Sequence, residues 1–188
     1  PQRIIGLFPE WYAPPQPDWP SQSRLTGFPL FDAAFGTTTT TEVERFLKAG
    51  SPPIVFVPGS ANQQAESFFI AATDACKKLR RRGVFLTRYP HQVPRDLPSE
   101  ICSFDYVPLS QILPRALALV HHGGIGTPAQ GLAAGIPQLV MPMSYDQPDN
   151  AARLVDLGVG DWLLPKHFTA DRVAEKLQRL LILSLIHI

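Results

Sequence analysis

Short apolar runs alternate with longer stretches of helical periodicity along most of the chain. Apolar runs predict strands over residues 54–57, 84–87, 102–107, 117–121 and 138–141. Helices are predicted over residues 41–50, 61–82 and 148–157, and from about residues 128 and 170 onward. Because strands that alternate with helices in this way form a parallel sheet covered on both faces, we expect an α/β fold with a Rossmann-like, doubly wound sheet.

The stretch from Pro9 to Pro29 breaks this pattern with six prolines and the aromatic residues Trp11, Tyr12 and Trp19. Such a composition is typical of an extended, aromatic-anchored connector rather than a folded element. We therefore divide the chain into a connector from a preceding domain, residues 1–36, and a globular domain, residues 37–182. The apolar ending, residues 183–188, has the character of a cloning or reading-frame scar.

Composition excludes several classes of protein. A length of 188 residues with 45% hydrophobic residues suits one soluble domain, and a net charge of +1 gives no reason to expect a nucleic-acid partner. Cys76 and Cys102 are too few for a disulfide framework and favour a reducing compartment, so we expect a cytoplasmic protein. The chain has no leader peptide and no apolar run of about 18 residues, so nothing in it indicates a membrane association.

Ligands of parallel sheets bind outside the carboxyl ends of the strands. Four predicted loops begin there, at Pro58, Val107, His122 and Met143. We expect these loops to line one crevice.

The loop after the strand 117–121 is rich in glycine and enters a helix. Gly123, Gly124 and Gly126 let the backbone approach a ligand, and the free NH groups of a helix start favour an anion such as a phosphate. Thr127 is a predicted N-cap, with Pro128 in the first turn and Gln130 at capping-box spacing. The alternative is that the glycines serve only a tight turn.

A second loop, Pro58-Gly59-Ser60, also follows a buried strand, and Ser60 and Gln63 have capping-box spacing. Two such loops at one sheet edge suggest a diphosphate held from both sides. A rival interpretation is a dinucleotide fingerprint over residues 124–129, with Asp146 near the position of a ribose-binding acid. That fingerprint normally follows the first strand of its fold, whereas at least three strands are predicted before this one.

Four segments together resemble the donor-binding signature of the UDP-glycosyltransferase family of the GT-B fold. They are Tyr106–Leu113, His122–Thr127, Gly131–Pro137 and Asp146–Asn150. The His121-His122 pair, the Asp-Gln-Pro run and the segments 18–20 and 26–28 are most similar to the sterol-glucosyltransferase-like branch. The resemblance covers the chain to about Leu180. It implies that residues 37–182 are the donor-binding C-terminal half of a glycosyltransferase and that residues 1–36 lead from an N-terminal acceptor domain.

The resemblance also implies a role for individual residues. Tyr106 would stack on uracil, the Val107 backbone would bind the base edge, and His122 would donate to the diphosphate. Asp146 and Gln147 would bind hydroxyls of the donor sugar, while Gln130 would hold the ribose. NH or hydroxyl groups of the two loops would complete the diphosphate site: Gly59, Ser60, Gly124, Gly126 and Thr127.

Each of these residues also has a purely structural interpretation. Tyr106 suits a core position at a strand end, and His122 suits a buried histidine with satisfied hydrogen bonds. Asp146 and Gln147 suit the cap of the helix that Pro148 begins. Leu109 and Gln130 stand where many relatives have glutamine and glutamate, so the base and ribose contacts depart from the family pattern.

The implied reaction is transfer of a hexose from a nucleotide diphosphate, UDP-glucose first, to a hydroxyl of a small-molecule or lipid acceptor. It would use no cofactor and no metal ion, because the glycine loop and His122 would stabilise the leaving diphosphate. The resemblance places the general base in the N-terminal domain, so no catalytic residue is expected in this chain, which alone would be inactive. The alternatives are an NAD-dependent oxidoreductase domain and a non-catalytic nucleotide-binding module.

Overall fold

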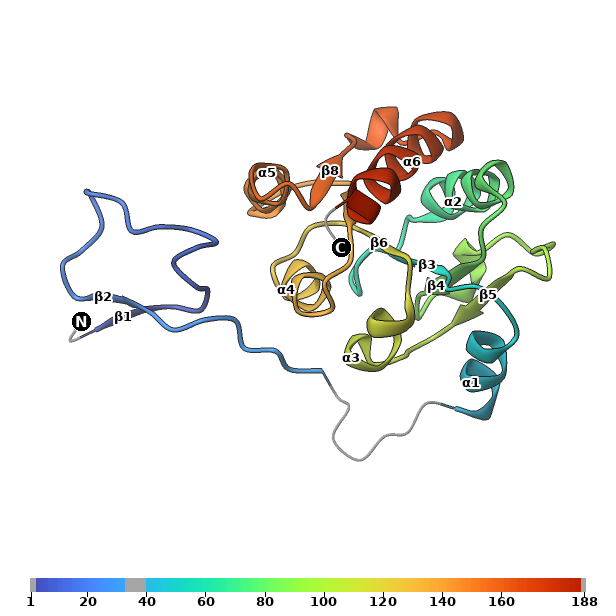
Figure 1. The fold of residues 1–188 in the computed structure, drawn as a ribbon, viewed down its shortest axis with the longest axis horizontal. Coiled ribbons are helices and arrows are strands. Elements are labelled where there is room, and N and C mark those ends of the chain that lie inside the picture. The colour runs from blue at the N-terminus through green and yellow to red at the C-terminus, as the bar shows by residue number, and fades with distance from the viewer. Residues whose placement is uncertain (1–2, 33–39, 187–188) are drawn as a thin grey trace.

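A computed structural model describes residues 3–32 and 40–186, with side chains up to Ile182. Its centre is a six-stranded parallel sheet in the order β5-β4-β3-β6-β7-β8 (Figure 1). The strands are β3 (Ile54–Val57), β4 (Gly83–Leu86), β5 (Ile101–Phe104), β6 (Ala118–His121), β7 (Gln138–Val140) and β8 (Gly160–Trp162). The helices are α1 (Thr41–Lys48), α2 (Glu66–Leu79), α3 (Leu109–Ile112), α4 (Gly126–Ala133), α5 (Gln147–Asp156) and α6 (Ala170–Ile186). This confirms the predicted α/β class and doubly wound parallel sheet.

Helices cover both faces of the sheet because its central strands are apolar on both sides. Phe56 of β3 packs with α2 and α6, and Phe68 of α2 stacks on Phe168, which precedes α6, with ring centroids 4.9 Å apart. The next residue back, Val55, faces the opposite side and packs against the apolar residues of α1 and α3. Successive strand residues point to opposite faces. The residues of β3 thus pack into a core on each face of the sheet, which explains why the run that predicted this strand is apolar throughout.

The strand order sets the position of the ligand site. When the six strands of the sheet are numbered in chain order, their order across the sheet is 3-2-1-4-5-6. The chain therefore adds strands to one side of β3 and then, from β6, to the other side, which makes the gap between β3 and β6 the topological switch point. Val57 and His121, the last residues of these two strands, lie opposite each other. The loops that follow them, beginning at Pro58 and His122, therefore flank the switch point where ligands of such sheets bind. The fingerprint at residues 124–129 follows the fourth strand of the sheet, as the sequence predicted.

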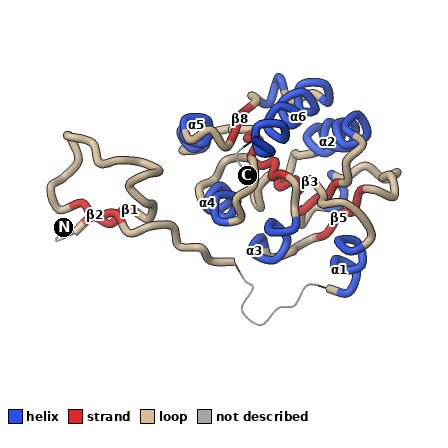
Figure 2. Tube along the Cα trace, viewed as in Figure 1, coloured by secondary structure: helices blue, strands red, loops and turns tan. Residues whose placement is uncertain are grey.

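The N-terminal segment contains structure that the sequence did not predict. β1 (Ile4–Gly6) and β2 (Ser23–Leu25) pair in parallel as a separate two-stranded sheet, coloured red at the left of Figure 2. The expectation of a connector without folded elements was wrong here. The two strands lie on either side of the proline-rich stretch, and each has three residues, which is too short to show the alternation of a strand.

Two predicted helix starts were wrong, whereas α1 begins at Thr41 as predicted, and the hydroxyl of its N-cap Thr40 accepts from the Val43 amide. α2 begins at Glu66 after Ala65, so Ser60 and Gln63 form no capping box, and segment 58–64 is a loop. α4 begins at Gly126 after Ile125, so Thr127 lies within the first turn and is not the N-cap. Capping-box spacing also occurs by chance, because Ser, Thr and Gln are common in loops.

Other boundaries moved by a few residues. α2 ends at Leu79 instead of residue 82 because Arg80 adopts the left-handed conformation with φ 52°. β5 ends at Phe104, so Tyr106 lies in the loop beyond the strand. The short elements α3 and β8 were not predicted. The proposed boundary at residues 36 and 37 lies outside the described residues, as do residues 187–188 of the suspected scar.

Across residues 3–32 and 40–186, every helix is too short or too polar to cross a membrane.

Candidate functional site

A cavity of about 500 Å³ opens at the carboxyl edge of the sheet, beside the switch point. Segment 58–64 after β3 forms one wall, and Met143, Tyr145 and Gln147 form another; His122 lines it too. We call it the His122 cavity. Three of the four loops that the sequence placed at one crevice therefore meet here.

The side chain of His122 is packed between two glycines. A Cβ atom on Gly124 would lie 2.6 Å from Nε2 of His122, and one on Gly59 would lie 3.1 Å from Nδ1. Gly59 also has φ +104°, which disfavours any other residue. Both glycines are therefore needed for the imidazole to lie between the two loops. The sequence predicted Gly59, Gly124 and His122 at one site, and the structure brings them together.

Burial lowers the pKa of His122, while the Val57 backbone and the Asp146 carboxylate act in the opposite direction. Nδ1 is buried, and no partner with hydrogen-bond geometry reaches it from the described residues. Since burial dominates, the unliganded imidazole is neutral near pH 7 and can carry a proton on only one ring nitrogen. An anion bound in the cavity would favour the charged ring, which has two donors.

His121 next to it has a structural role. Its ring is fully buried, Nε2 lies 3.0 Å from Oε1 of Gln138, and Nδ1 accepts the Gly123 amide at 3.0 Å. Because Nδ1 accepts, the ring proton is on Nε2 and is donated to Gln138. Desolvation lowers the pKa of His121 to about 3. The ring is therefore neutral and holds the start of the glycine loop.

Asn150, to which the sequence gave no role, holds the other side of that loop. Its Nδ2 donates to the Gly123 carbonyl at 2.9 Å and to Oδ2 of Asp146 at 2.7 Å. Its Oδ1 accepts from the hydroxyl of Tyr12 at 2.9 Å. The spacing of Asp146 and Asn150, four residues apart at a helix start, was the signal that could have indicated this pair.

Gln147 shapes the loop that carries Tyr145. Its Oε1 accepts the amides of Met143 and Ser144 at 2.8 and 3.3 Å. Asp146 is exposed, and its carboxylate accepts from Asn150 instead of capping α5. The interpretation of both residues as simple helix caps is therefore wrong, although their contact with a sugar stays a prediction.

A second, smaller cavity of about 150 Å³ shares Gly59 and Ser60 with the first and is lined by Tyr106, Val107 and Arg88 among others. We call it the Tyr106 cavity. The Tyr106 side chain is 44% exposed, so it is no core residue, and Val107 is buried at the base of the loop. The two cavities thus place the predicted base-binding and phosphate-binding residues on either side of Gly59.

Not every predicted site residue lines these cavities. Gln130 is buried within α4, and neither lining includes it, nor Gly123, Gly124, Gly126, Thr127 or Asp146. Gly124 lies against the His122 ring, Asn150 bonds to Gly123 and Asp146, and Gly126 and Thr127 form the first turn of α4. The ribose role of Gln130 has the least structural support.

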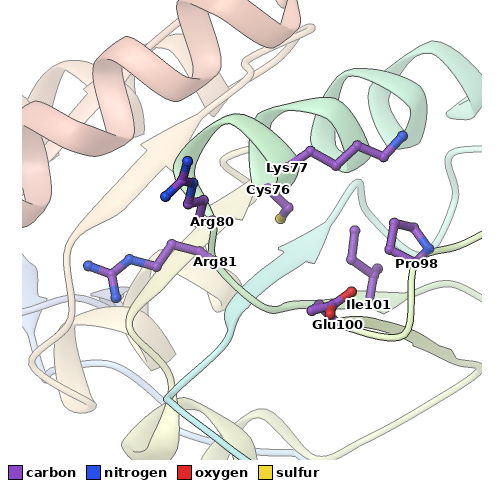
Figure 3. Close-up of a pocket in the computed structure, with 7 residues that line it drawn as sticks. All are labelled: Cys76, Lys77, Arg80, Arg81, Pro98, Glu100 and Ile101. Carbon is purple, nitrogen blue, oxygen red and sulfur yellow. The ribbon is translucent and has the colours of Figure 1, made fainter.

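A third cavity, of about 330 Å³, lies at the opposite edge of the sheet, where β5 begins (Figure 3). Figure 3 shows that the guanidinium groups of Arg80 and Arg81 point away from Cys76 and Ile101. The Cys76 thiol is buried, and this raises its pKa to about 12. The Cys76 thiol is therefore protonated, and the Arg80 and Arg81 guanidinium groups do not point toward it, so this cavity holds no activated nucleophile. We assign the functional site to the carboxyl edge of the sheet.

No cluster of three or more His, Cys, Asp or Glu side chains with the proximity to hold a metal ion is found among the residues that the structure describes.

A family model described as "Erythromycin biosynthesis protein CIII-like, C-terminal domain" matches residues 86–182. The match begins in β4 and includes the Tyr106 loop, the glycine loop and the loop before α5. The residues predicted from the sequence to bind the base, the diphosphate and the sugar fall within it, except Gly59 and Ser60.

Curated relatives and solved structures agree with this match. A Streptomyces fradiae O-mycaminosyltylonolide 6-deoxyallosyltransferase is 37% identical over 147 residues, which are 77% of this chain and 34% of that protein. A sterol 3-beta-glucosyltransferase of Arabidopsis thaliana is 32% identical over 157 residues, 80% of this chain and 24% of that protein. The solved glycotransferase of kitacinnamycin superimposes with a TM-score of 0.78 at 25% identity, over 98% of this chain and 49% of its own. The chain thus spans 34% and 24% of the length of these two curated relatives.

Proposed function

We propose that this chain, which belongs to the EryCIII-like family of GT-B glycosyltransferases and has the fold of their C-terminal domains, binds the nucleotide-sugar donor of a hexosyl transfer. The observation that carries the proposal is His122, fixed between Gly59 and Gly124 at the sheet switch point, four residues before the start of α4. An imidazole and backbone amides in this arrangement suit a diphosphate.

The diphosphate would lie in the His122 cavity and the base in the Tyr106 cavity. Both cavities are lined by Gly59 and Ser60, so they adjoin, and a nucleotide would extend from one to the other past these residues. The sugar would then lie toward Met143 and Gln147. This arrangement supports the predicted contacts of Tyr106, His122 and Gln147.

During transfer, negative charge develops on the diphosphate as the bond to the sugar breaks. The amides at the start of α4, the positive end of its dipole and the His122 imidazole would stabilise that charge. We infer a transfer that uses no metal ion and no cofactor. The general base and the acceptor site would belong to the part of the protein that precedes this chain.

We propose UDP-glucose as the donor, on the resemblance of the Tyr106 loop and the Asp146-Gln147 pair to UDP-glycosyltransferases. The names of the relatives include a deoxyallosyltransferase and a glucosyltransferase, so the family accepts more than one sugar. A sterol or other lipid-like alcohol as acceptor is supported only by the Arabidopsis relative.

The test is calorimetric titration of the chain with UDP, UDP-glucose, dTDP and NAD. We expect saturable binding of UDP and UDP-glucose, at least tenfold weaker in His122→Ala and unchanged in His167→Ala, a histidine that lines neither cavity. Binding of NAD with UDP silent would support a dinucleotide domain instead. Equal UDP affinity in wild type and His122→Ala would contradict the proposed diphosphate site.

A further inference from the structure

Tyr12 of the N-terminal segment contacts α5 beside the candidate site. Although it lies among prolines, it is 4% exposed, and its hydroxyl donates to Oδ1 of Asn150 across 138 residues of sequence. Its ring packs edge-on against Phe28 with centroids 5.0 Å apart. Arg153 of α5 donates to the Tyr12 carbonyl at 3.1 Å. A buried phenol with this many contacts is a specific docking point rather than a chance contact.

The Asn150 amide is fully used. Its oxygen accepts from Tyr12, and its two N–H groups go to the Gly123 carbonyl and to Asp146. The Gly123 carbonyl and the Asp146 carboxylate can only accept, so they fix the amide with its nitrogen toward them, and the Tyr12 hydroxyl holds the amide oxygen on the other side. If the amide were reversed, its oxygen would face two other oxygens.

The Gly123 carbonyl belongs to the same planar peptide unit as the Gly124 amide. In a trans peptide these two groups point in opposite directions. Asn150 draws the carbonyl toward α5, so the Gly124 N–H is turned away from α5, and Gly124 itself lies against the His122 ring, where a Cβ would be 2.6 Å from Nε2. The second N–H of Asn150 fixes the Asp146 carboxylate next to the predicted sugar-binding residue Gln147.

We propose that Tyr12 is a positioning residue for the donor site, acting through Asn150 on the Gly124 amide and on Asp146. Because the contact is shared, the same network couples the N-terminal segment to the donor: a bound diphosphate that orders the glycine loop also strengthens the docking of Tyr12. Thermodynamic linkage requires this coupling to be equal in both directions. The inference rests on the proposed donor-binding function.

The test combines UDP titration with hydrogen exchange of the peptide covering residues 9–13, on wild type and two variants. In wild type, UDP should slow exchange of this peptide, whose Tyr12 and Ala13 amides donate to the Pro9 carbonyl. Tyr12→Phe keeps the ring but loses the hydroxyl. We expect its UDP affinity to fall about fivefold and the UDP-dependent slowing to disappear.

Asn150→Asp separates positioning from anchoring. An aspartate can still accept from Tyr12, but it cannot donate to the Gly123 carbonyl. We expect residues 9–13 to exchange as slowly as in wild type without ligand, whereas UDP affinity falls at least as far as in Tyr12→Phe. If Tyr12 and Asn150 form only a structural anchor, Asn150→Asp should keep both the slow exchange of residues 9–13 and the UDP affinity of wild type.

Each outcome decides between the ideas. If wild type fails to bind UDP, the proposed function falls and this inference with it. If wild type binds UDP but Tyr12→Phe binds equally well, with only a lower unfolding temperature, Tyr12 is an anchor and the positioning role is wrong. Weakened binding without a change in hydrogen exchange would leave positioning but overturn the coupling.

Discussion

At the residue scale, two adjacent histidines show how position sets chemistry. His121 points into the core and His122 into the cavity, as successive residues at a strand end must. Burial holds the pKa of His121 at about 3, below the ordinary value of 6.5. The unfolded chain therefore takes up a proton at this position as the pH falls below about 6.5, whereas the folded chain does not until about pH 3.

We expect this histidine to make the protein less stable in acid. Between pH 6.5 and 4.5 it should lower the free energy of unfolding by up to about 1.4 kcal/mol per pH unit. His121→Gln, measured by urea unfolding at several pH values, should show a shallower slope over that range, although it is less stable at pH 7. His167→Gln serves as the control and should keep the wild-type slope. Parallel slopes in all three proteins would show that His121 is not buried neutral.

Gly124 provides a second prediction at this scale. Because a Cβ there would lie 2.6 Å from His122 Nε2, Gly124→Ala should displace the imidazole and weaken UDP binding at least tenfold. Gly158→Ala is the matched control: its φ of +72° makes alanine costly by about 1 kcal/mol, but nothing lies within 4 Å and the site is untouched. Calorimetry should show weakened binding in the first variant only. Similar affinities in both variants would mean that His122 can move aside without loss.

At the element scale, the C-cap of α2 is Arg80, whose backbone has a left-handed conformation that residues other than glycine rarely adopt. Arg80 has φ 52°, and its amide bonds to the carbonyls of Cys76 and Lys77 to close the helix. Arg80→Gly should raise the free energy of unfolding by about 0.5–1 kcal/mol, because glycine adopts this conformation without strain. Thermal unfolding checks the gain. Arg81→Gly, one residue further and not left-handed, should give no such gain; equal effects would show that charge removal is responsible.

The same elements indicate what could be read from the sequence. Apolar runs predicted five of the six sheet strands because a doubly covered strand leaves no polar positions. Helix starts were less predictable, because Ser60 and Thr127 have the right spacing but the chain begins α2 and α4 elsewhere. β8 and the pair β1–β2 escaped because three residues carry no period. In the site, His122 and its two glycines were predictable from strand-end position, but Asn150 and Tyr12 were not, since their contact joins residues 138 apart.

At the scale of the whole molecule, the proposed donor site occupies the carboxyl edge of the sheet, and no acceptor site or general base is assigned among the described residues. The superposition with the solved kitacinnamycin glycotransferase includes 98% of this chain but 49% of that one, so about half of that protein has no counterpart in this chain. We infer that the donor is bound by this half and that the acceptor and the general base are contributed by the other. The isolated chain should therefore bind the donor but not catalyse the transfer.

The isolated chain should bind UDP-glucose without releasing UDP from it. At a ligand concentration of about 100 Kd, binding should stabilise the fold by about 2.7 kcal/mol, which thermal unfolding detects and which shows that the site is formed. A coupled assay for free UDP, with an alcohol acceptor present, should then give no signal above a protein-free control. The cause would be a missing base rather than a missing donor, because the family resemblance places the general base in the N-terminal domain. UDP release that depends on the acceptor and is lost in His122→Ala would instead place the catalytic machinery in this half.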